Sequence, residues 1–442
     1  MTAREAAFKV LGGYRRGGAL PGVALGGMSK ELTPPDAALA MRIVNGVLQN
    51  AALIDYYISS FSSIKLKKIE PRVLDILRLS IYQLAFMTKI PHSAAVDEGV
   101  KLASVNANPR AAGFVNALLR KAADASGKMS LPQVAADSAA QILSIKYSHP
   151  EWLVKEFIAS FGEDSAEALL RANNADSLPV TAQVNTLLAS AEDVIRELEN
   201  DGVTARRHEW LDACVEMSAT GDMTRLSSFK KGHIYIQDAA ARLAVHAASP
   251  EPGMFVIDGC AAPGGKSFAA AVMMKNTGKI AAFDLTQDKA GRISDGANRL
   301  KLEIVSAEIR DAAAPAADHA GKADIVIADV PCSGFGVIRK KPEIRYKTEQ
   351  SVSGLPDIQK SLLQSLSAYV KPGGVLLYST CSLLERENEA VTGWFVGCND
   401  DFRKEEFELP HIGRITSGEC TLLPHIHGTD GFYICKMRRD AP

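Results

Sequence analysis

The sequence predicts a multidomain protein with an all-α N-terminal domain, a small α+β connecting subdomain and a C-terminal α/β domain. Three observations support this prediction. The length of 442 residues suits two or three domains. Apolar residues recur at helical spacing through the first 125 residues. From residue 253 onward, apolar runs that end in an acidic residue alternate with helix-compatible stretches. We place the boundaries at residues 1–142, 143–232 and 233–442.

The N-terminal segment is predicted to be helical almost throughout. Apolar residues recur every three or four positions in residues 6–12, 36–50, 52–60, 73–88, 94–104 and 111–123. Pro35 and Pro71 suit the first turn of a helix, where a missing N–H costs nothing. No catalytic cluster is evident in this segment.

A small, polar stretch at residues 123–138 fits a linker. After it, helical stretches (residues 152–161, 165–172 and 191–199) alternate with short strand-like runs such as residues 180–185. Residues 234–238 then lead into a helix that continues to Val245. This mixture indicates a small α+β subdomain.

Composition and charge limit the class of protein. The chain is 47% hydrophobic and 23% charged, as in soluble globular proteins. Its polar N-terminus is no secretion signal and no apolar run is long enough to span a bilayer, so we expect a cytoplasmic protein without a membrane contact. Residues 1–142 carry 17 Lys and Arg against 10 Asp and Glu. That surplus suits either a module that faces polyanions or a solvated helical surface.

The seven cysteines do not form a recognisable framework. Their number is odd and no two stand in a C-x-x-C arrangement, so neither disulfides nor a metal site are expected. In a reducing compartment most of them should be buried, inert thiols. A cysteine with a chemical role must therefore be identified from its neighbours.

The C-terminal domain is predicted to contain a parallel sheet. Apolar runs at residues 255–258, 280–284 and 325–329 each end in aspartate, a weaker run through Val305 ends near Asp311, and a fifth covers residues 374–380. Ligands bind beyond the carboxyl ends of such strands, so the strand-end acids and Cys381 should line one crevice. Residues 431–437 alternate like a strand and would add an antiparallel edge.

The loop after the first of these strands, Gly259–Ser267, predicts a nucleoside site. A P-loop would need glycine where Cys260 stands, and Pro263 interrupts the series of N–H groups that would face phosphates. The dinucleotide pattern G-x-G-x-x-G is absent. Asp284, 26 residues after Asp258, is placed to accept ribose hydroxyls. S-adenosyl-L-methionine is the commonest cofactor of this kind, and we expect it here.

Two cysteines stand at predicted strand ends, in Asp329-Val330-Pro331-Cys332-Ser333 and in Thr380-Cys381-Ser382. A pair of thiols suits methylation at C5 of a pyrimidine, because addition of a thiolate to C6 makes C5 nucleophilic. The other cysteine is a candidate for assisting removal of the C5 proton. Asp329 is placed to hold N3 or the exocyclic amine of the base. The residues alone do not order the two thiols.

A basic run follows the first of these cysteines. Arg339-Lys340-Lys341, with Arg345 and Lys347, would contact RNA phosphates beside the base pocket; the alternative is a solvated loop.

At these motifs the chain resembles the Sun/RsmB family of bacterial RNA cytosine-C5 methyltransferases. The resemblance is carried by Asp258-Gly259-Cys260-Ala261-Ala262-Pro263-Gly264-Gly265-Lys266, Asp329-Val330-Pro331-Cys332-Ser333, Tyr378-Ser379-Thr380-Cys381-Ser382 with Glu387-Asn388, and Asp430-Gly431-Phe432-Tyr433. The N-terminal segment resembles the NusB-type RNA-binding helical domain through Tyr82-Gln83-Leu84, Ile90-Pro91-His92 and Phe114-Val115-Asn116-Ala117-Leu118-Leu119-Arg120.

The resemblance implies a class I, Rossmann-like S-adenosyl-L-methionine-dependent methyltransferase domain and a cytosine of 16S ribosomal RNA as substrate. It implies that Cys381 is the nucleophile and that Cys332 helps to release the product. The implied cofactor contacts are Cys260, Ala261, Ala262, Pro263, Gly264, Gly265, Lys266, Asp284, Asp311 and Asp329. No metal is implied.

The chain departs from the family pattern at two positions. Gln183 precedes Val184-Asn185 at a position where the family has arginine, and this replacement would weaken an RNA contact. Ala241 stands where the family has serine. Two alternatives stay open: the same chemistry on transfer RNA, and a non-catalytic RNA-binding or antitermination factor. The expected partner is 16S ribosomal RNA, free or in a partly assembled small subunit, and the expected state is a monomer.

Overall fold

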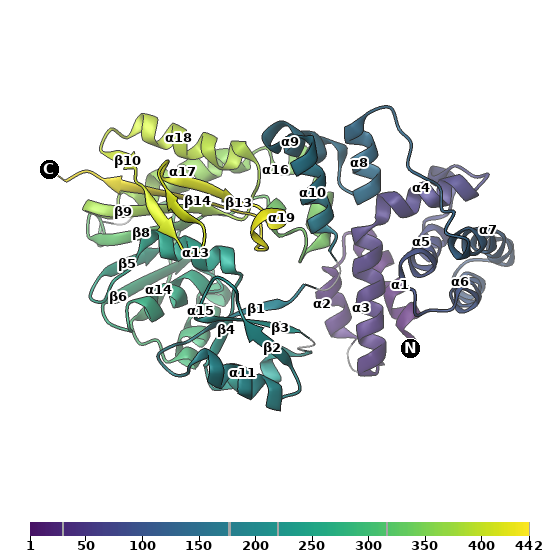
Figure 1. Ribbon diagram of the computed structural model, residues 1–442, viewed down its shortest axis with the longest axis horizontal. Coiled ribbons are helices and arrows are strands. Elements are labelled where there is room, and N and C mark those ends of the chain that lie inside the picture. Colours follow the sequence, from purple (N-terminus) through teal and green to yellow (C-terminus); the bar gives the residue numbers. More distant parts are fainter. Residues whose placement is uncertain (29–30, 176–177, 219–220, 315–316, 442) are drawn as a thin grey trace. The chain divides into compact units, whose positions relative to one another are not determined.

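The computed structural model describes residues 1–28, 31–175, 178–218, 221–314 and 317–441. The chain folds into two compact units, Met1–Asn174 and Ala175–Pro442. Figure 1 labels the elements of both units. The division falls inside the predicted connecting subdomain: its helices before residue 174 belong to the first unit, and its strands and the helix near residues 191–199 belong to the second. The predicted boundaries at residues 142 and 232 stay a prediction.

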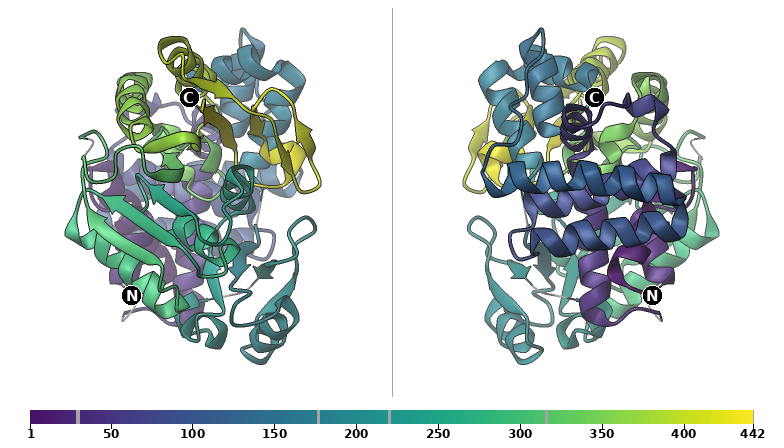
Figure 2. Two further views of the ribbon diagram at one scale, coloured as in Figure 1. Left: turned by 90° about the vertical axis from the view of Figure 1, so that its left-hand side faces the viewer. Right: turned by 90° about the vertical axis from the view of Figure 1, so that its right-hand side faces the viewer.

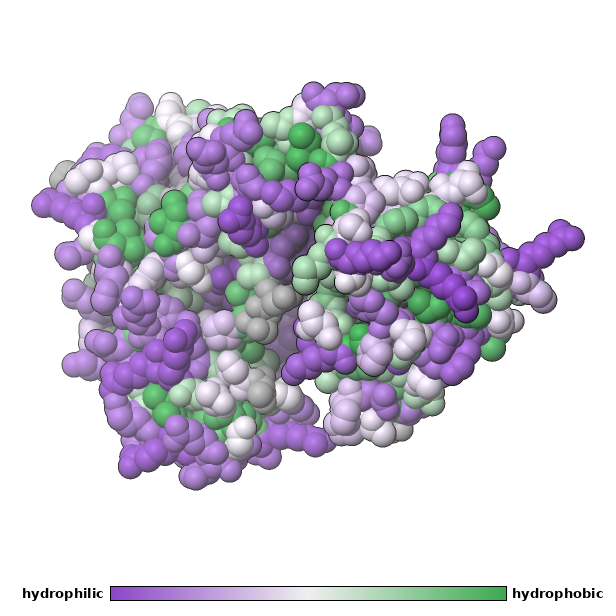
Figure 3. All heavy atoms as spheres, turned by 45° about the vertical axis from the view of Figure 1, so that its right-hand side comes forward, coloured by the Kyte–Doolittle hydropathy of each residue, from purple (hydrophilic) through white to green (hydrophobic). Residues whose placement is uncertain are grey.

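The first unit is helical, as predicted. Each of the six predicted N-terminal helices is present, and α2 is an addition that its Gly-rich sequence did not predict. The elements are α1 (Ala3–Arg15), α2 (Pro21–Gly27), α3 (Pro34–Gln49), α4 (Ala51–Phe61), the 3₁₀ turn η2 (Leu66–Lys68), α5 (Pro71–Phe86), α6 (His92–Asn106), α7 (Pro109–Gly127), α8 (Ala139–Tyr147), α9 (Glu151–Phe161) and α10 (Glu163–Asn173). On the face shown in Figure 3, hydrophilic side chains project from this unit among smaller apolar areas.

Local sequence signals explain where these helices begin. Thr2 accepts from the backbone of Glu5, whose side chain accepts from Thr2 in return, which is a capping box. Pro35 and Pro71 stand in first turns, as predicted. In the core, Gly46 faces Tyr82 so closely that an added Cβ would lie 1.9 Å from the ring. Among the described residues no single helix could cross a membrane, and only the bent pair α3 and α4 meets the length and composition criteria.

The second unit begins with a four-stranded antiparallel sheet in the order β2-β3-β1-β4. Its strands are β1 (Val180–Val184), β2 (Thr204–Arg207), β3 (Cys214–Ser218) and β4 (Ile234–Ile236), with the helices α11 (Ala191–Asn200) and α12 (Ser227–Lys230) and the turn η3 (Met223–Arg225). The amide of Asn185 donates to the carbonyl of Leu300 at 2.8 Å and ties this sheet to the α/β part of the unit. Gln183 is buried and donates to the carbonyl of Gln237 at 3.2 Å, so its side chain serves the interior and has no surface to offer RNA.

The main sheet has eight strands in the order β10-β14-β9-β8-β5-β6-β7, with β13 also paired to β14. The strands are β5 (Phe255–Asp258), β6 (Lys279–Asp284), β7 (Val305–Ile309), β8 (Ala323–Asp329), β9 (Val370–Thr380), β10 (Phe402–Lys404), β13 (Glu419–Leu422) and β14 (Phe432–Arg439). Strands β5 to β9 are parallel, as predicted. The prediction that the tail forms an edge is wrong. β14 is antiparallel to β9, as expected, but β10 and β13 pair with its other side, so β14 is an interior strand.

Helices cover both faces of this sheet (Figure 2, left). On one face, Val256 and Leu377 pack with α13 (Ala239–Ala248), α14 (Gly265–Met273) and α15 (Gln287–Leu300). On the other, Ile257 and Leu376 pack with α17 (Leu355–Ser367) and α18 (Glu389–Cys398). The remaining elements are η4 (Phe335–Val337), η5 (Pro342–Tyr346), α16 (Glu349–Val352), η6 (Glu385–Glu387), β11 (Phe407–Leu409), β12 (Gly413–Ile415) and α19 (Pro424–His427). The layers confirm the predicted Rossmann-like α/β domain.

Candidate active site

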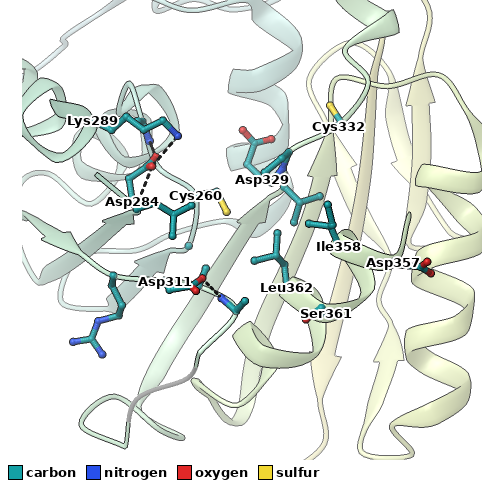
Figure 4. A pocket seen from close by; sticks show the side chains of 18 of the residues that line it. Cys260, Asp284, Lys289, Asp311, Asp329, Cys332, Asp357, Ile358, Ser361 and Leu362 are labelled. Atoms are coloured by element: carbon teal, nitrogen blue, oxygen red, sulfur yellow. Dashed lines mark hydrogen bonds and ion pairs between the residues drawn. The ribbon is translucent and has the colours of Figure 1, made fainter. Parts of the chain in front are cut away.

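A cavity of about 720 Å³ opens at the carboxyl ends of the parallel strands. This is the position that the topology of an open α/β sheet predicts for a ligand. Figure 4 shows Asp284 and Lys289 on one side of it and Asp357, Ile358 and Ser361, from α17, on the other. The lining residues are Gly259, Cys260, Ala262, Asp284, Leu285, Lys289, Arg310, Asp311, Ala312, Ala313, Asp329, Val330, Pro331, Cys332, Asp357, Ile358, Ser361, Leu362 and Cys381.

The loop after β5 supplies one wall. The N–H of Gly259 donates to Ile327 and that of Ala261 donates to Phe283, so the loop is fixed to the neighbouring strands β8 and β6. Gly264 has φ +108°, which favours glycine, and a Cβ there would lie 2.3 Å from the ring of Phe268. Of the predicted contacts, Cys260 and Ala262 line the cavity; Ala261, Pro263, Gly264, Gly265 and Lys266 stand behind them. A contact of these five with the cofactor stays a prediction.

Asp284 ends β6 with its carboxylate in the cavity wall. The carboxylate accepts from the N–H of Ala262 at 3.1 Å and of Leu285 at 2.8 Å, and pairs with Lys289 at 3.0 Å. A carboxylate has about four acceptor positions, and these three donors occupy three of them, so one remains for a ligand hydroxyl. Asp284 therefore fixes the loop and can also accept from a ribose.

Acidic and apolar groups share the rest of the wall. Asp311, just beyond β7, accepts from the N–H of Ala313 at 2.9 Å with one oxygen, and no other described residue is recorded as a donor to its carboxylate. Ile358 and Leu362, one turn apart on α17, add apolar surface opposite the loop. Arg310 lines the cavity, but its guanidinium binds Asp318 and Glu308. The cavity thus offers carboxylates and an apolar face, which suits a cationic cofactor with an aromatic base.

The prediction that all the strand-end acids line one crevice is wrong for one of them. Asp258 is buried below the loop and does not line the cavity. The hydroxyl of Ser267 donates to one of its oxygens at 2.7 Å. Burial raises the pKa of Asp258 to about 6. The side chain supports the loop from within, because β5 ends two residues short of its neighbours β6 and β8.

The two cysteines that the sequence singled out meet at the cavity. The Sγ atoms of Cys332 and Cys381 lie 3.2 Å apart. The hydrogen bond from Cys332 lowers the pKa of Cys381, and the ammonium of Lys266 acts in the same direction. The same hydrogen bond, together with burial, raises the pKa of Cys332 well above its ordinary value. The contact between the two sulfurs therefore favours ionisation of Cys381 over ionisation of Cys332.

Asp329 lies beside this pair with its charge compensated. The ammonium of Lys266 binds one carboxylate oxygen at 2.6 Å, and the hydroxyl of Ser379 donates to the other at 2.8 Å. Its side chain keeps 30% of its surface exposed and faces the cavity. Asp329 can therefore accept a hydrogen bond from an amine without losing its own support.

The basic run after Cys332 has a structural role. Arg339 and Lys340 form ion pairs with Asp238 and Asp430, and the side chain of Arg339 is only 8% exposed. Arg345 is fully buried. The prediction of a contact with RNA phosphates is wrong for the buried Arg345, and the nearly buried Arg339 is held in ion pairs. Lys340, Lys341 and Lys347 are exposed, and for them that contact stays a prediction. The two acids that bind Arg339 and Lys340 come from segments far away in the sequence, which spacing alone cannot indicate.

Several lining residues escaped prediction from the sequence. Lys289 and the α17 residues Ile358, Ser361 and Leu362 carry no motif, and only the fold brings them to the loop. For the α17 residues, the helical spacing of apolar residues within 355–367 was the single sequence signal available.

Sequence profiles identify three segments. The profile described as 16S rRNA methyltransferase RsmB/F matches residues 245–438, that of the NusB family matches residues 1–124, and that of an RsmF/B-like ferredoxin-like domain matches residues 149–224. Full-length relatives agree. Probable ribosomal RNA small subunit methyltransferase B of Bacillus subtilis is 35% identical, over 93% of this chain and 92% of that protein. Its counterpart from Synechocystis is 31% identical, over 99% and 100%. The chain belongs to the ribosomal RNA small subunit methyltransferase B family.

Solved structures agree with this membership. The crystal structure of PH0851 is 29% identical, covers 95% of this chain and 94% of that one, and superposes with a TM-score of 0.77. A methyltransferase homologue from Pyrococcus horikoshii is 27% identical with a TM-score of 0.57, over 69% of this chain and 100% of that one. The predicted resemblance and the NusB-like plus α/β architecture are confirmed.

S-adenosyl-L-methionine is the cofactor of this methyltransferase family, and the cavity fits it. Asp284 keeps acceptor capacity for ribose hydroxyls, and Asp311 has an oxygen available for an amine. Gly259 faces the cavity where a Cβ would collide with Leu366 at 2.5 Å, so the wall there is backbone, which a ligand can approach closely.

Alkylation should distinguish Cys381 from Cys260, the cysteine of the cavity wall that is a predicted cofactor contact. Burial raises the pKa of Cys260 to about 12, so at pH 8 its thiolate fraction is on the order of one in ten thousand. We expect iodoacetamide at pH 8 to modify Cys381 and the exposed Cys398 and to leave Cys260 intact, as read by peptide mass spectrometry. Faster modification of Cys260 than of Cys381 would contradict the assignment.

Lys266 should help to set the ionisation of Cys381. In Lys266→Met the cation is lost, the thiolate is less stabilised, and the pKa of Cys381 rises. The pH profile of the alkylation rate of Cys381 should then shift to higher pH. Lys360→Met, which removes a cation stacked on Trp394, is the control and should leave the profile in place. An unmoved profile in Lys266→Met would refute the role.

Proposed function

We propose that this protein is an S-adenosyl-L-methionine-dependent methyltransferase that forms 5-methylcytosine in 16S ribosomal RNA through a covalent adduct between Cys381 and C6 of the base. The observation that carries the proposal is the 3.2 Å contact of the two sulfurs at the rim of the cofactor cavity. Methylation of an amine or a hydroxyl needs no thiolate, whereas C5 of cytosine becomes nucleophilic only after a thiolate adds to C6. The printed names of the relatives, ribosomal RNA small subunit methyltransferase B, support the choice of RNA.

The target cytosine must leave its stack to reach the cavity. Asp329 accepts a hydrogen bond from the exocyclic amine, and its pairing with Lys266 holds the carboxylate in place. The thiolate of Cys381 then forms a bond to C6, and the electrons of the C5–C6 double bond move towards C5. S-adenosyl-L-methionine, when bound, supplies the methyl group that C5 takes up.

Product release needs a base. Once its sulfur is bonded to carbon, Cys381 no longer accepts the hydrogen of Cys332, and Cys332 gives that proton to water in the open cavity. The Cys332 thiolate then removes the proton from C5, the C5–C6 double bond forms again, and Cys381 leaves as a thiolate. The net change replaces the C5 hydrogen by methyl and releases one proton.

Cytoplasmic location and the monomeric state stay predictions.

The proposal is tested by locating the modification. Purified protein, S-adenosyl-L-methionine and either small-subunit RNA, partly assembled small subunits or transfer RNA are incubated, and 5-methylcytosine is mapped by bisulfite sequencing. We expect one unconverted cytosine in the small-subunit RNA. Modification of transfer RNA alone would support the alternative substrate, and methylation without 5-methylcytosine would refute the chemistry.

Replacement of the nucleophile should abolish methyl transfer. In Cys381→Ala no thiolate can add to C6, so we expect the rate on small-subunit RNA to fall on the order of a thousandfold or more, measured with radiolabelled cofactor. Cys398→Ala, an exposed cysteine outside the cavity, should retain the wild-type rate. Substantial activity in Cys381→Ala would exclude the assigned nucleophile.

Replacement of the second cysteine should trap the adduct. In Cys332→Ala the C5 proton has no assigned base, so we expect a protein–RNA complex that survives denaturing electrophoresis. The double variant Cys332→Ala/Cys381→Ala should give none. If Cys381→Ala accumulated the adduct and Cys332→Ala did not, the two roles would have to be exchanged.

A further inference from the structure

A fully buried carboxylate connects the two cysteine loops. Glu387, at the end of η6, is 0% exposed. One oxygen accepts from the backbone N–H of Ser333 at 2.8 Å, and the other accepts from the hydroxyl of Ser382 at 2.9 Å. These donors belong to the residues that directly follow Cys332 and Cys381. One side chain therefore holds the residue next to each sulfur.

Further hydrogen bonds make this connection rigid. The amide of Gln359, from α17, donates to Glu387 at 2.9 Å and to the carbonyl of Pro331 at 3.0 Å. The hydroxyls of Ser333 and Ser382 contact each other at 2.9 Å. A buried carboxylate with three donors is well satisfied, so the position of each loop depends on the other. The separation of the two sulfurs follows from this network.

The charge of Glu387 acts unequally on the two thiols. Beyond the hydrogen bond with Cys381 and burial, Glu387 and Asp329 contribute to the raised pKa of Cys332. For Cys381 the neighbouring charges are Lys266, which lowers its pKa, and Asp329 and Asp430, which oppose it. Asp329 is shared by both sulfurs and does not discriminate between them. Glu387, which raises the pKa of Cys332, and Lys266, which lowers the pKa of Cys381, do discriminate between them.

We propose that Glu387 is a positioning residue that holds the sulfurs of Cys332 and Cys381 in contact and keeps their shared hydrogen on Cys332. This role deepens the proposed function, on which its catalytic meaning rests. Glu387 lies behind the loops, does not line the cavity and acts through the two cysteines.

The decisive variant is Glu387→Gln, which keeps the length of the side chain and removes the charge and one acceptor. The test uses the full-length protein without RNA or cofactor and measures alkylation of Cys381 and Cys332 by iodoacetamide against pH. In the wild type Cys381 should react first. In Glu387→Gln we expect the ratio of the two rates to fall about tenfold, because the pKa of Cys332 is no longer raised by that charge. Glu385→Gln, an exposed acid of the same turn, is the matched control and should keep the ratio.

Methyl transfer supplies a second readout. We expect kcat of Glu387→Gln to fall at least tenfold with KM for S-adenosyl-L-methionine within twofold, and Glu387→Asp, which keeps the charge, to restore part of the rate ratio. If Glu387→Gln does not fold, Gln359→Met, which removes one donor and keeps the charge, should lower the ratio less. An unchanged ratio in a folded variant overturns the proposal even if its unfolding temperature is lower. Absence of methyl transfer by the wild type would refute the proposed function alone, because the alkylation ratio does not depend on it.

Discussion

The parallel pairing of β8 with β9 is the constraint on which the site depends. In this register Asp329 stands opposite Ser379, so the two strands end almost level. Cys332 follows three residues after Asp329, and Cys381 follows two residues after Ser379. Because parallel neighbours direct their carboxyl ends to one edge, segments 49 residues apart in sequence bring their sulfurs to 3.2 Å. A shift of the register would separate the thiols and also break the hydrogen bond between Ser379 and Asp329.

The order of the strands also explains which parts of the site could be predicted from the sequence. The loop after β5, the acids of β6 and β8 and both cysteines are local to strand ends, and a run of apolar residues before a polar one reveals each strand. The pairing of Cys332 with Cys381 needed the order of the strands, and their different roles needed either the family or the contacts of Lys266 and Glu387. Residues contributed by a helix, such as Ile358 and Leu362, carry no local signal because any amphipathic helix would look alike.

The errors have a common physical cause. Arg339 lies in a charged segment, and charged segments are usually solvated, yet Asp238 and Asp430 pair with it from elsewhere in the chain and its side chain is only 8% exposed. The tail was predicted to be an edge strand, but β10 and β13, from elsewhere in the chain, pair with its outer side. Asp258 was expected in the crevice because it ends a strand, but β5 ends two residues short of both neighbouring strands. In each case burial depended on distant partners, which periodicity does not report.

The coupling of the two thiols gives the proposed cycle an internal order. At the start, the hydrogen bond to Cys381 is the main reason that the pKa of Cys332 is raised, so Cys332 keeps its hydrogen while Cys381 attacks. When the sulfur of Cys381 becomes a thioether it loses its negative charge and most of its capacity to accept, and that cause of the raised pKa disappears. Cys332 becomes more acidic at the step that needs a thiolate base. The contact between the two sulfurs thus favours ionisation of Cys381 and keeps Cys332 protonated until the adduct has formed.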